Sequence, residues 1–206
     1  MTAGPTREYL DDVRYLSNTS TGRMGYELAR EAKRRGANVT LVLGPTALPP
    51  LAGVRTIDVV STRDLLKAAR AAVRGADLVI FAAAPADWRP ATRARGKLKK
   101  DGSGRPRTLT LVENPDVAAI LGRSKGARFH LGFALEVSRA LEHGREKMTR
   151  KRFDALVLNG PENVGRGGGK AWMLFPRAKA VALPTGNKTK TARAILDAIW
   201  SLLPHP

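Results

Sequence analysis

Short apolar runs alternate with segments of helical periodicity along most of this 206-residue chain. Two of the runs, Leu78-Val79-Ile80-Phe81 and Ala155-Leu156-Val157-Leu158, are continuously apolar, which is typical of parallel strands covered on both faces. Strands are therefore predicted at residues 38–43, 55–60, 77–83, 128–134, 154–158, 171–175 and 179–183.

Helical patterns fill the intervals between these strands. The first predicted helix is capped by Ser20 and runs to about Arg35, with Gly36 as its C-terminal stop. Another starts at Asn114-Pro115-Asp116, where a proline costs no hydrogen bond. The remaining helices are predicted at residues 63–73, after Thr62, and at 136–151 and 188–203.

This alternation predicts an α/β fold with a Rossmann-like, doubly wound, mainly parallel sheet and helices on both faces. The length fits a single domain over residues 1–206. Two stretches interrupt the alternation: a long, basic, β-rich excursion at 88–112 and a glycine-rich loop at 161–170. Connections of this length in compact domains are usually functional, so both are candidates for a role at the site.

The chain is strongly basic, with 36 Lys and Arg against 18 Asp and Glu. Such a charge attracts nucleotides, nucleic acid and anionic lipid, but it is equally typical of a basic surface with no specific ligand. The absence of cysteine excludes disulfides and thiolate chemistry. Because no apolar run approaches the roughly 18 residues of a membrane span, we expect a cytoplasmic protein with no membrane partner.

Three segments carry residues suited to nucleotide chemistry. Residues 13–25 bring hydroxyl side chains and glycines to a helix start, which favours a phosphate or is simply a helix cap. Asp87 follows a predicted strand, where a carboxylate can bind a ribose hydroxyl or a metal, or cap a turn. Lys97, Lys99 and Lys100 can neutralise a triphosphate, or can form a solvated basic loop.

Taken together, these segments resemble the phosphopantothenoylcysteine synthetase family in content and order. The segments that carry the resemblance are Ala3-Gly4-Pro5-Thr6-Arg7-Glu8, Arg14-Tyr15-Leu16-Ser17-Asn18-Thr19-Ser20-Thr21-Gly22-Arg23-Met24-Gly25, Ala83-Ala84-Pro85-Ala86-Asp87-Trp88, Lys97-Leu98-Lys99-Lys100, Glu113-Asn114-Pro115-Asp116, Gly132-Phe133-Ala134-Leu135-Glu136, and Lys147, Lys151, Asp154 and Asn159. They span nearly the whole chain, and the ordered set is far more specific than any one of them.

The resemblance implies a ligase that joins 4′-phosphopantothenate to L-cysteine in coenzyme A biosynthesis, using CTP and Mg²⁺. The carboxylate of 4′-phosphopantothenate would attack the α-phosphate of CTP to give an acyl-cytidylate and pyrophosphate. The amine of cysteine would then displace CMP. The residues alone leave CTP and ATP both open and assign no metal ligand; the resemblance favours CTP.

The resemblance also implies roles for individual residues. Asn18 would orient the acyl-cytidylate, Arg14 would support its loop, and Lys97 would act when the amine attacks. The nucleotide would be bound by Gly4, Ala84, Asp87, Phe133, Lys147 and Lys151, with the ribose at Asp87, the cytosine at Ala84 and Phe133, and the triphosphate at the two lysines. A homodimer joined through the 88–112 excursion, which would also serve as an active-site flap, is expected.

The chain departs from the family pattern at three places. Only Met1-Thr2 precedes the Ala-Gly-Pro-Thr segment, so either the start of the chain is set too late or the first strand is truncated, which would remove a central strand of the sheet. The decarboxylase half that commonly accompanies this domain in the family is also missing, so that activity is expected to come from another protein. Arg166-Gly167-Gly168-Gly169-Lys170 stands where the family usually has an acidic residue and Asn. His130, inside a strand pattern, is expected to be packed rather than catalytic.

Two other functions fit parts of the sequence. One is a nucleotide-binding relative that has lost catalysis with its first strand. The other is a basic α/β protein that binds nucleic acid. Nucleic acid is the weaker partner, because only 5% of residues are aromatic and none stands beside Lys97, Lys99 and Lys100 to stack on a base.

Overall fold

The computed structural model describes residues 1–136, 138–160, 162 and 169–203. Its strands are β1 (Thr2–Ala3), β2 (Arg7–Tyr9), β3 (Tyr15–Ser17), β4 (Thr40–Leu43), β5 (Arg55–Asp58), β6 (Leu78–Phe81), β7 (Trp88–Pro90), β8 (Leu111–Glu113), β9 (Phe129–Leu135), β10 (Ala155–Asn159), β11 (Ala171–Leu174) and β12 (Val181–Leu183). Its helices are α1 (Arg23–Arg34), α2 (Thr62–Ala72), α3 (Val117–Arg123), α4 (Ala140–Lys151) and α5 (Lys188–Trp200).

Within these described residues, the main sheet has eight strands in the order β12-β11-β10-β9-β6-β1-β4-β5. The run from β10 to β5 is parallel throughout, and β11 and β12 extend it by antiparallel pairing. The chain moves outward from β1 through β4 to β5, then returns and moves the other way through β6, β9 and β10. This reversal confirms the predicted doubly wound, mainly parallel sheet.

The first strand is short, as expected, but the centre of the sheet is not lost. Thr2 and Ala3 pair with Val42 and Leu43 of β4, and Thr2 also pairs with Phe81 of β6. Two residues are enough here because both neighbouring strands supply hydrogen-bonding partners. Of the two alternatives for the start of the chain, the loss of the central strand is therefore wrong.

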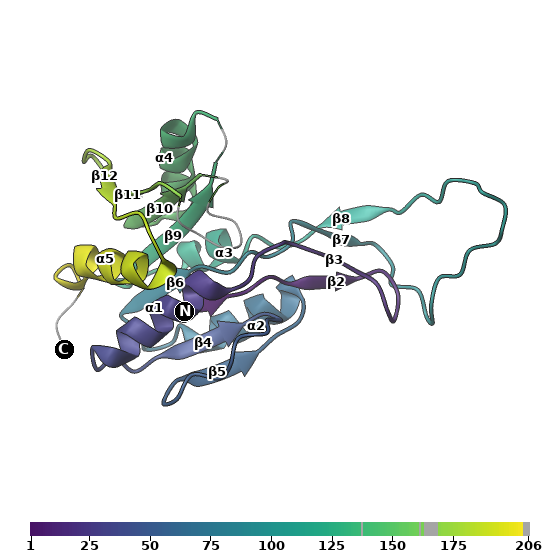
Figure 1. The fold of residues 1–206 in the computed structure, drawn as a ribbon, viewed down its shortest axis with the longest axis horizontal. Helices are drawn as coiled ribbons and strands as arrows, with labels where there is room; N and C mark the ends of the chain where they lie inside the picture. Colours follow the sequence, from purple (N-terminus) through teal and green to yellow (C-terminus); the bar gives the residue numbers. More distant parts are fainter. Residues whose placement is uncertain (137, 161, 163–168, 204–206) are drawn as a thin grey trace.

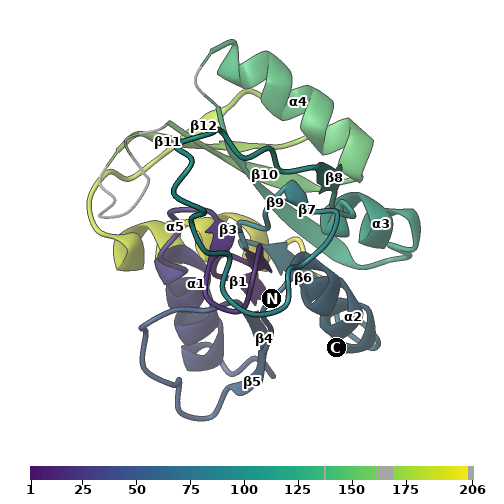
Figure 2. The same cartoon turned by 90° about the vertical axis from the view of Figure 1, so that its right-hand side faces the viewer.

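Helices cover the two faces of the sheet separately (Figures 1 and 2). On one face, α1 and α5 pack over a core that includes Ile80, Leu131 and Val157. On the other face, α2, α3 and α4 pack over a core that includes Leu156 and Leu158. Because successive strand residues point to opposite faces, the continuously apolar runs serve both cores, as predicted.

Two antiparallel ribbons, β2–β3 and β7–β8, extend away from the sheet side by side (Figure 1). Residues 91–110, between β7 and β8, contain no helix or strand and form the far end of this extension. Asp12 links the two ribbons, since it pairs with Arg93 at 2.8 Å and accepts a hydrogen bond from the backbone of Gly96. The predicted excursion is thus a projecting arm that begins and ends in short strands.

Several predicted boundaries differ from the structure. Gly22, not Ser20, is the N-cap of α1, while Gly36 follows the end of the helix with a positive φ of 89°, as expected of a stop. Helix α4 starts at Ala140 rather than 136, because β9 continues to Leu135 and Glu136 still donates its backbone N–H to Asn159. Pro115 precedes the N-cap Asp116 instead of lying in the first turn of α3. Most of the 161–170 loop, including Arg166-Gly167-Gly168, lies outside the described residues.

Candidate active site

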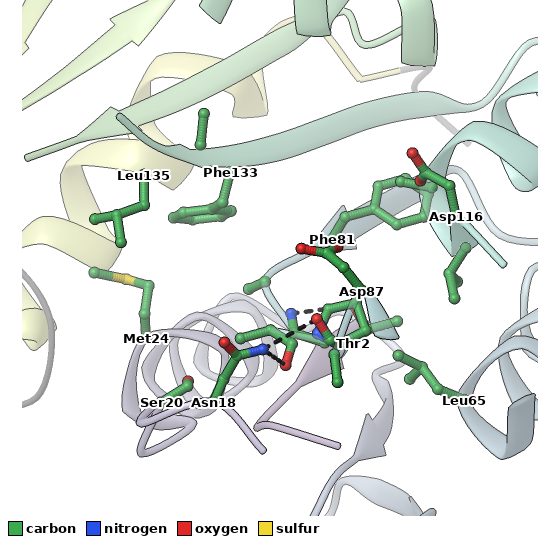
Figure 3. A pocket seen from close by; sticks show the side chains of 18 of the residues that line it. Thr2, Asn18, Ser20, Met24, Leu65, Phe81, Asp87, Asp116, Phe133 and Leu135 are labelled. Atoms are coloured by element: carbon green, nitrogen blue, oxygen red, sulfur yellow. Dashed lines mark hydrogen bonds between the residues drawn. The ribbon is translucent and has the colours of Figure 1, made fainter. Parts of the chain in front are cut away.

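A cavity of about 810 Å³ opens at the carboxyl ends of β1, β6, β9 and β10. It lies where the chain reverses direction across the sheet, between β1 and β6, which is where doubly wound sheets bind their ligands. Residues from both faces line it, so it is not enclosed by one layer of helices. Figure 3 shows Met24 and Leu135 at one end of this pocket and Asp116 at the other.

The side chain of Asn18 connects the loop before α1 to the turn after β6. Its Nδ2 donates to the carbonyl oxygens of Ala84 at 2.9 Å and Pro85 at 3.0 Å (Figure 3). Two carbonyl acceptors fix which end of the amide carries the nitrogen, and the amide oxygen faces away from the turn. Asn18 therefore helps to hold the turn in position. While these two hydrogen bonds are kept, a ligand can bond to Asn18 only through the amide oxygen.

The turn at residues 84–87 is also held from behind. Thr6 Oγ1 accepts from the backbone N–H of Ala86 at 2.9 Å, and Asn114 Nδ2 donates to the Ala86 carbonyl at 2.9 Å. Asn114 further donates its backbone N–H to the Asp87 carbonyl at 2.7 Å. With its backbone fixed in this way, Asp87 presents an exposed carboxylate at the cavity.

Cations from α4 line the cavity beside α3. Lys151 Nζ lies 2.9 Å from the Asp116 carboxylate, and Lys147 Nζ lies 3.8 Å from Glu136. Burial, and then the nearby charge of Lys151, lower the pKa of Lys147. A basic group with a lowered pKa in a cleft gains from an anionic ligand, because the ligand restores the stabilisation that burial removed.

The structure brings together six of the nine site residues expected from the sequence. Asn18, Ala84, Asp87, Phe133, Lys147 and Lys151 all line the one cavity. Gly4, Arg14 and Lys97 do not.

Gly4 lies directly behind the cavity, where three stretches of backbone cross. Its φ is +80°, and a Cβ there would come within 2.9 Å of the Gly44 carbonyl oxygen. A Cβ on Gly22, the N-cap of α1, would come within 3.1 Å of the Gly4 Cα. Glycine at position 4 therefore lets the backbone at Gly44 approach the central strand, and glycine at position 22 lets the start of α1 approach it, so both glycines contribute to the structure of the site.

Arg14 and Lys97 lie on the projecting arm. Arg14 Nε pairs with Asp11 at 3.1 Å, and its guanidinium also donates to the carbonyl of Leu98. Lys97 is exposed beside this contact. Arg14 thus ties the β2–β3 ribbon to the loop that carries Lys97, at a distance from the cavity of the same chain.

Three cations of the cavity were not predicted from the sequence as site residues. Arg23 and Lys188 line it from the starts of α1 and α5, and Arg150 lines it from α4. Arg23 lies in a recognised motif, whereas Arg150 and Lys188 belong to helices with several other basic residues, so only the three-dimensional arrangement singles those two out. Thr6 was likewise missed as a support for the 84–87 turn, although it lies in a recognised motif.

The carboxylates of the cavity do not form a metal site on their own. Among the described residues, no group of three or more His, Asp or Glu could hold a metal ion. Mg²⁺ in nucleotide-binding proteins is commonly held by substrate phosphates, water and one or two carboxylates, and Asp87 is an exposed carboxylate in this cavity. The described residues therefore fit a metal that enters with a nucleotide.

These features define the class of doubly wound α/β proteins that bind a ligand at the switch point of the sheet. The chain belongs to the family described as DNA/pantothenate metabolism flavoprotein C-terminal domain, which matches residues 1–203. In the described part of the chain, no helix is long and apolar enough to cross a membrane.

Similar proteins include bifunctional proteins of coenzyme A biosynthesis, named CoaBC. The chain is 40% identical to the one from Vibrio vulnificus strain YJ016, with 100% of this chain and 52% of the relative covered. It is also 40% identical to that of Escherichia coli strain K12, with 97% and 50% covered. The chain thus spans about half the length of these curated relatives.

Solved structures agree on the fold. The C-terminal domain of a CoaBC protein superimposes with a TM-score of 0.83 at 33% identity, covering 98% of this chain and 92% of that one. A DNA/pantothenate metabolism flavoprotein from Streptococcus pneumoniae gives a TM-score of 0.82 at 20% identity, with 98% and 97% covered. The second likeness supports the fold alone.

Proposed function

We propose that this chain is the synthetase that joins 4′-phosphopantothenate to L-cysteine, with a nucleoside triphosphate as the activating substrate. The observation that carries the proposal is the Asn18 amide bonded to the 84–87 turn inside the switch-point cavity. It unites two of the motifs on which the family resemblance rests. The 40% identity to CoaBC proteins over the whole chain supports the same activity.

In the first step, a carboxylate oxygen of 4′-phosphopantothenate forms a bond to the α-phosphorus of CTP. The bond from that phosphorus to the β-phosphate oxygen breaks, and pyrophosphate leaves. Phe133 and Ala84 would contact the cytosine, and Asp87 would accept hydrogen bonds from the ribose. Lys147 and Lys151 would neutralise the phosphates, and Asn18 would orient the acyl-cytidylate through the turn that it holds.

In the second step, the amine of cysteine bonds to the acyl carbon, the bond to the cytidylate oxygen breaks, and CMP leaves while the amine loses a proton. Lys97 would stabilise the charge that moves toward the departing phosphate. No side-chain nucleophile is required, because positioning and charge neutralisation provide most of the catalysis in such reactions. His130 takes no part, since it is 1% exposed within the sheet.

CTP rather than ATP is proposed as the nucleotide, entering together with Mg²⁺ as a metal–nucleotide complex. Mg²⁺ would reduce the negative charge of the triphosphate. A cytoplasmic location fits this use of soluble substrates.

A homodimer is proposed because the arm exposes several large apolar side chains. Val13, Tyr15, Trp88, Leu109 and Leu111 are each at least 40% exposed, and all lie on its two ribbons or their connections. Pairing with the arm of a second copy would cover them. Arg14 and Lys97 lie on the same arm, so dimer formation would also decide which cavity they serve.

The direct test is to incubate the pure protein with 4′-phosphopantothenate, cysteine and either CTP or ATP, and to measure pyrophosphate and the amide product. We expect pyrophosphate release that requires 4′-phosphopantothenate and is faster with CTP, and amide formation that also requires cysteine. Nucleotide binding without pyrophosphate release would identify an inactive relative. Tight, salt-dependent DNA binding with no turnover would favour the nucleic-acid function.

A further inference from the structure

The cavity is lined by two groups of cations that lie on opposite faces of the sheet. Lys147, Arg150 and Lys151 belong to α4, which packs on the face shared with α2 and α3. Arg23 and Lys188 belong to α1 and α5, which pack on the other face. The groups therefore approach the cavity from two sides. A single phosphate group is small enough to be bound by one of these two groups of cations alone.

A buried carboxylate holds Arg23 and the start of α5 in place. Glu27, only 1% exposed, lies 2.7 Å from Arg23 Nε and also pairs with Arg30. Its other oxygen accepts from the Thr189 hydroxyl at 3.1 Å, and Thr189 immediately follows Lys188. The start of α5 is thereby bonded to α1, and Lys188 and Arg23 are brought to the same wall.

Basic side chains gather at this wall. Arg23 and Arg30 both pair with the buried carboxylate of Glu27, and Lys188 lies next to Thr189, which bonds to the same carboxylate. The carboxylates that line the cavity come instead from β8 and from the segments after β6 and β8; they are Asp87, Glu113 and Asp116. An anion is therefore favoured beside α1 and α5.

Lys188 is also partly desolvated. Its side chain is half-buried, and burial lowers the pKa of its ammonium group. A charged group that has lost part of its hydration binds an anion more strongly than a fully hydrated surface lysine, because less water must be removed on binding. Among the basic residues near the start of α5, this distinguishes Lys188 from the exposed Lys190.

We propose that Arg23 and Lys188 form a phosphoryl-binding subsite, separate from the α4 lysines, within the cavity. The inference rests on the proposed function, in which both large substrates carry phosphoryl groups. The group bound here is either the phosphate monoester of 4′-phosphopantothenate or the terminal phosphate of the nucleotide. Cysteine, which carries no phosphate, makes no use of the subsite.

The test compares Lys188→Gln, Lys188→Arg and Arg23→Gln with wild type in steady-state kinetics, varying each substrate in turn. Loss of a charge-assisted hydrogen bond should raise the KM of one phosphorylated substrate about tenfold or more and leave that of cysteine unchanged. Lys188→Arg should restore most of this loss, because it keeps the charge. The substrate whose KM rises identifies the phosphoryl group bound at the subsite.

Two matched controls separate binding from structure. Lys190→Gln removes a cation two residues away on α5 that does not line the cavity, and it should behave as wild type. Arg30→Gln removes the second cation that pairs with Glu27. It tests whether disturbing the ion pairs of Glu27 is by itself enough to raise the KM. The proposal is overturned if both KM values stay unchanged in Lys188→Gln, or if Arg30→Gln matches Arg23→Gln.

A binding measurement keeps the subsite testable apart from turnover. Pyrophosphate and inorganic phosphate are titrated by calorimetry into wild type and Lys188→Gln. Weaker binding of either anion to the variant supports the subsite even if wild type makes no amide, which would contradict only the proposed function. The subsite is contradicted if both proteins bind these anions with equal affinity, or if neither protein binds them.

Discussion

The side-chain amide of Asn18 joins two segments that are 66 residues apart in the chain. Each segment alone is a loop of small residues with several conformations open to it. Because one amide group bonds two successive carbonyls, the turn after β6 is held in one position before any ligand arrives. Preorganisation of this kind is how a site without a strong nucleophile accelerates a reaction.

We predict that Asn18→Asp lowers amide formation about a hundredfold or more, in the range seen when a preorganised donor is lost. A carboxylate cannot donate to the Ala84 and Pro85 carbonyls and would repel both oxygens. Pyrophosphate and product are measured together, with folding checked by thermal unfolding. Asn38→Asp is the control. Asn38 is exposed and precedes β4 at the amino end of that strand, whereas the cavity lies at the carboxyl ends of the strands. Normal turnover by a folded Asn18→Asp protein would remove Asn18 from the mechanism.

His130 affects stability rather than catalysis. It is buried in β9, its ring lies edge-on to Phe81 at 5.2 Å, and neither ring nitrogen has a hydrogen-bond partner in the described part of the chain. Burial, and next the charge of Lys125, lower the pKa of His130 to about 4, against the opposing effect of Asp154. The folded protein therefore holds this imidazole neutral.

The expected consequence is acid destabilisation between about pH 6.5 and pH 4. In that window the unfolded chain binds a proton at this histidine and the folded chain does not. The free energy of unfolding should thus fall as the pH falls, by up to about 1.4 kcal/mol per pH unit. Urea unfolding at several pH values should show a smaller slope for His130→Phe than for wild type. Equal slopes would mean that other groups cause the effect.

Two carboxylates should change the free energy of unfolding only at lower pH. A hydrogen bond from the backbone N–H of Arg14 lowers the pKa of Asp11 to about 2, and one from the Arg34 side chain lowers that of Glu31 to about 2. Stability from these groups is present above their ordinary pKa values and is lost as the pH falls below about 4. The histidine window is therefore distinguishable from theirs.

Helix α1 packs closely against the sheet at Gly25. A Cβ on Gly25 would lie 2.4 Å from the Cβ of Ala3 in β1, well inside contact distance. Glycine at this position lets the helix lie directly against the central strand. Because Met24 and Arg23 precede it and line the cavity, the same contact places one end of the site.

We predict that Gly25→Ala destabilises the protein by about 1–3 kcal/mol, the usual cost of overpacking, although alanine favours helix by roughly 1 kcal/mol. Gly144→Ala in α4 is the matched control. There the nearest atom to the new Cβ, at 3.0 Å, is the end of the flexible Leu174 side chain. The control should be neutral or stabilising in thermal unfolding. Equal effects of the two substitutions would show that the contact with Ala3 is not what limits this position.

Element types were predictable from the sequence because their patterns are long and periodic, whereas boundaries depended on tertiary contacts. The continuous apolar run at 155–158 led correctly to a strand covered on both faces, which forms β10. The start of α4 could not be predicted, because pairing of Glu136 with Asn159 extends β9 by residues that also suit a helix. Likewise, the N-cap of α1 is Gly22, which packs closely against Gly4, a contact that sequence spacing does not reveal.

The candidate site was predictable where it rests on motifs and not where it rests on helix packing. Asn18 and Asp87 lie in recognised segments and do line the cavity. Lys188 lies in no recognised segment, and it reaches the cavity where Thr189 bonds the start of α5 to Glu27 of α1. Conversely, Lys97 lies in a recognised motif but does not line the cavity, because the arm that carries it extends away from the sheet.

At the scale of the whole molecule, the positive charge is unevenly distributed. Residues 88–112 contain eight Lys and Arg against one Asp, so this tenth or so of the chain carries +7 of the net +18. The arm also carries exposed apolar side chains, including Trp88, which is 49% exposed. A cationic and apolar surface of this kind suits a flap that covers an anionic substrate while it contacts another protein surface.

The position of Lys97 bears on whether one chain makes a complete site. The loop that carries it is bonded to the β2–β3 ribbon on both sides, since Gly96 donates to Asp12 at 2.7 Å and Leu98 donates to Asp11 at 3.0 Å. These bonds hold Lys97 out along the arm and away from the cavity of its own chain. In the proposed homodimer, the same arm can present Lys97 to the cavity of the partner.

Two inactive variants should then restore activity when mixed. Lys97→Gln alone should still release pyrophosphate but form little amide, because the lysine acts on the second step only. Asn18→Asp alone should also form little. In a mixed dimer, one cavity combines the intact Asn18 of one protomer with the intact Lys97 of the other. Random exchange in a symmetric dimer should therefore recover about a quarter of wild-type amide formation.

To test this, the mixture is denatured, refolded and assayed. Sedimentation confirms that dimers have formed, and Lys99→Gln is the control for lost charge. Dimers that recover no activity would show that Lys97 serves the cavity of its own chain, which would require the bonds to Asp11 and Asp12 to open during the reaction.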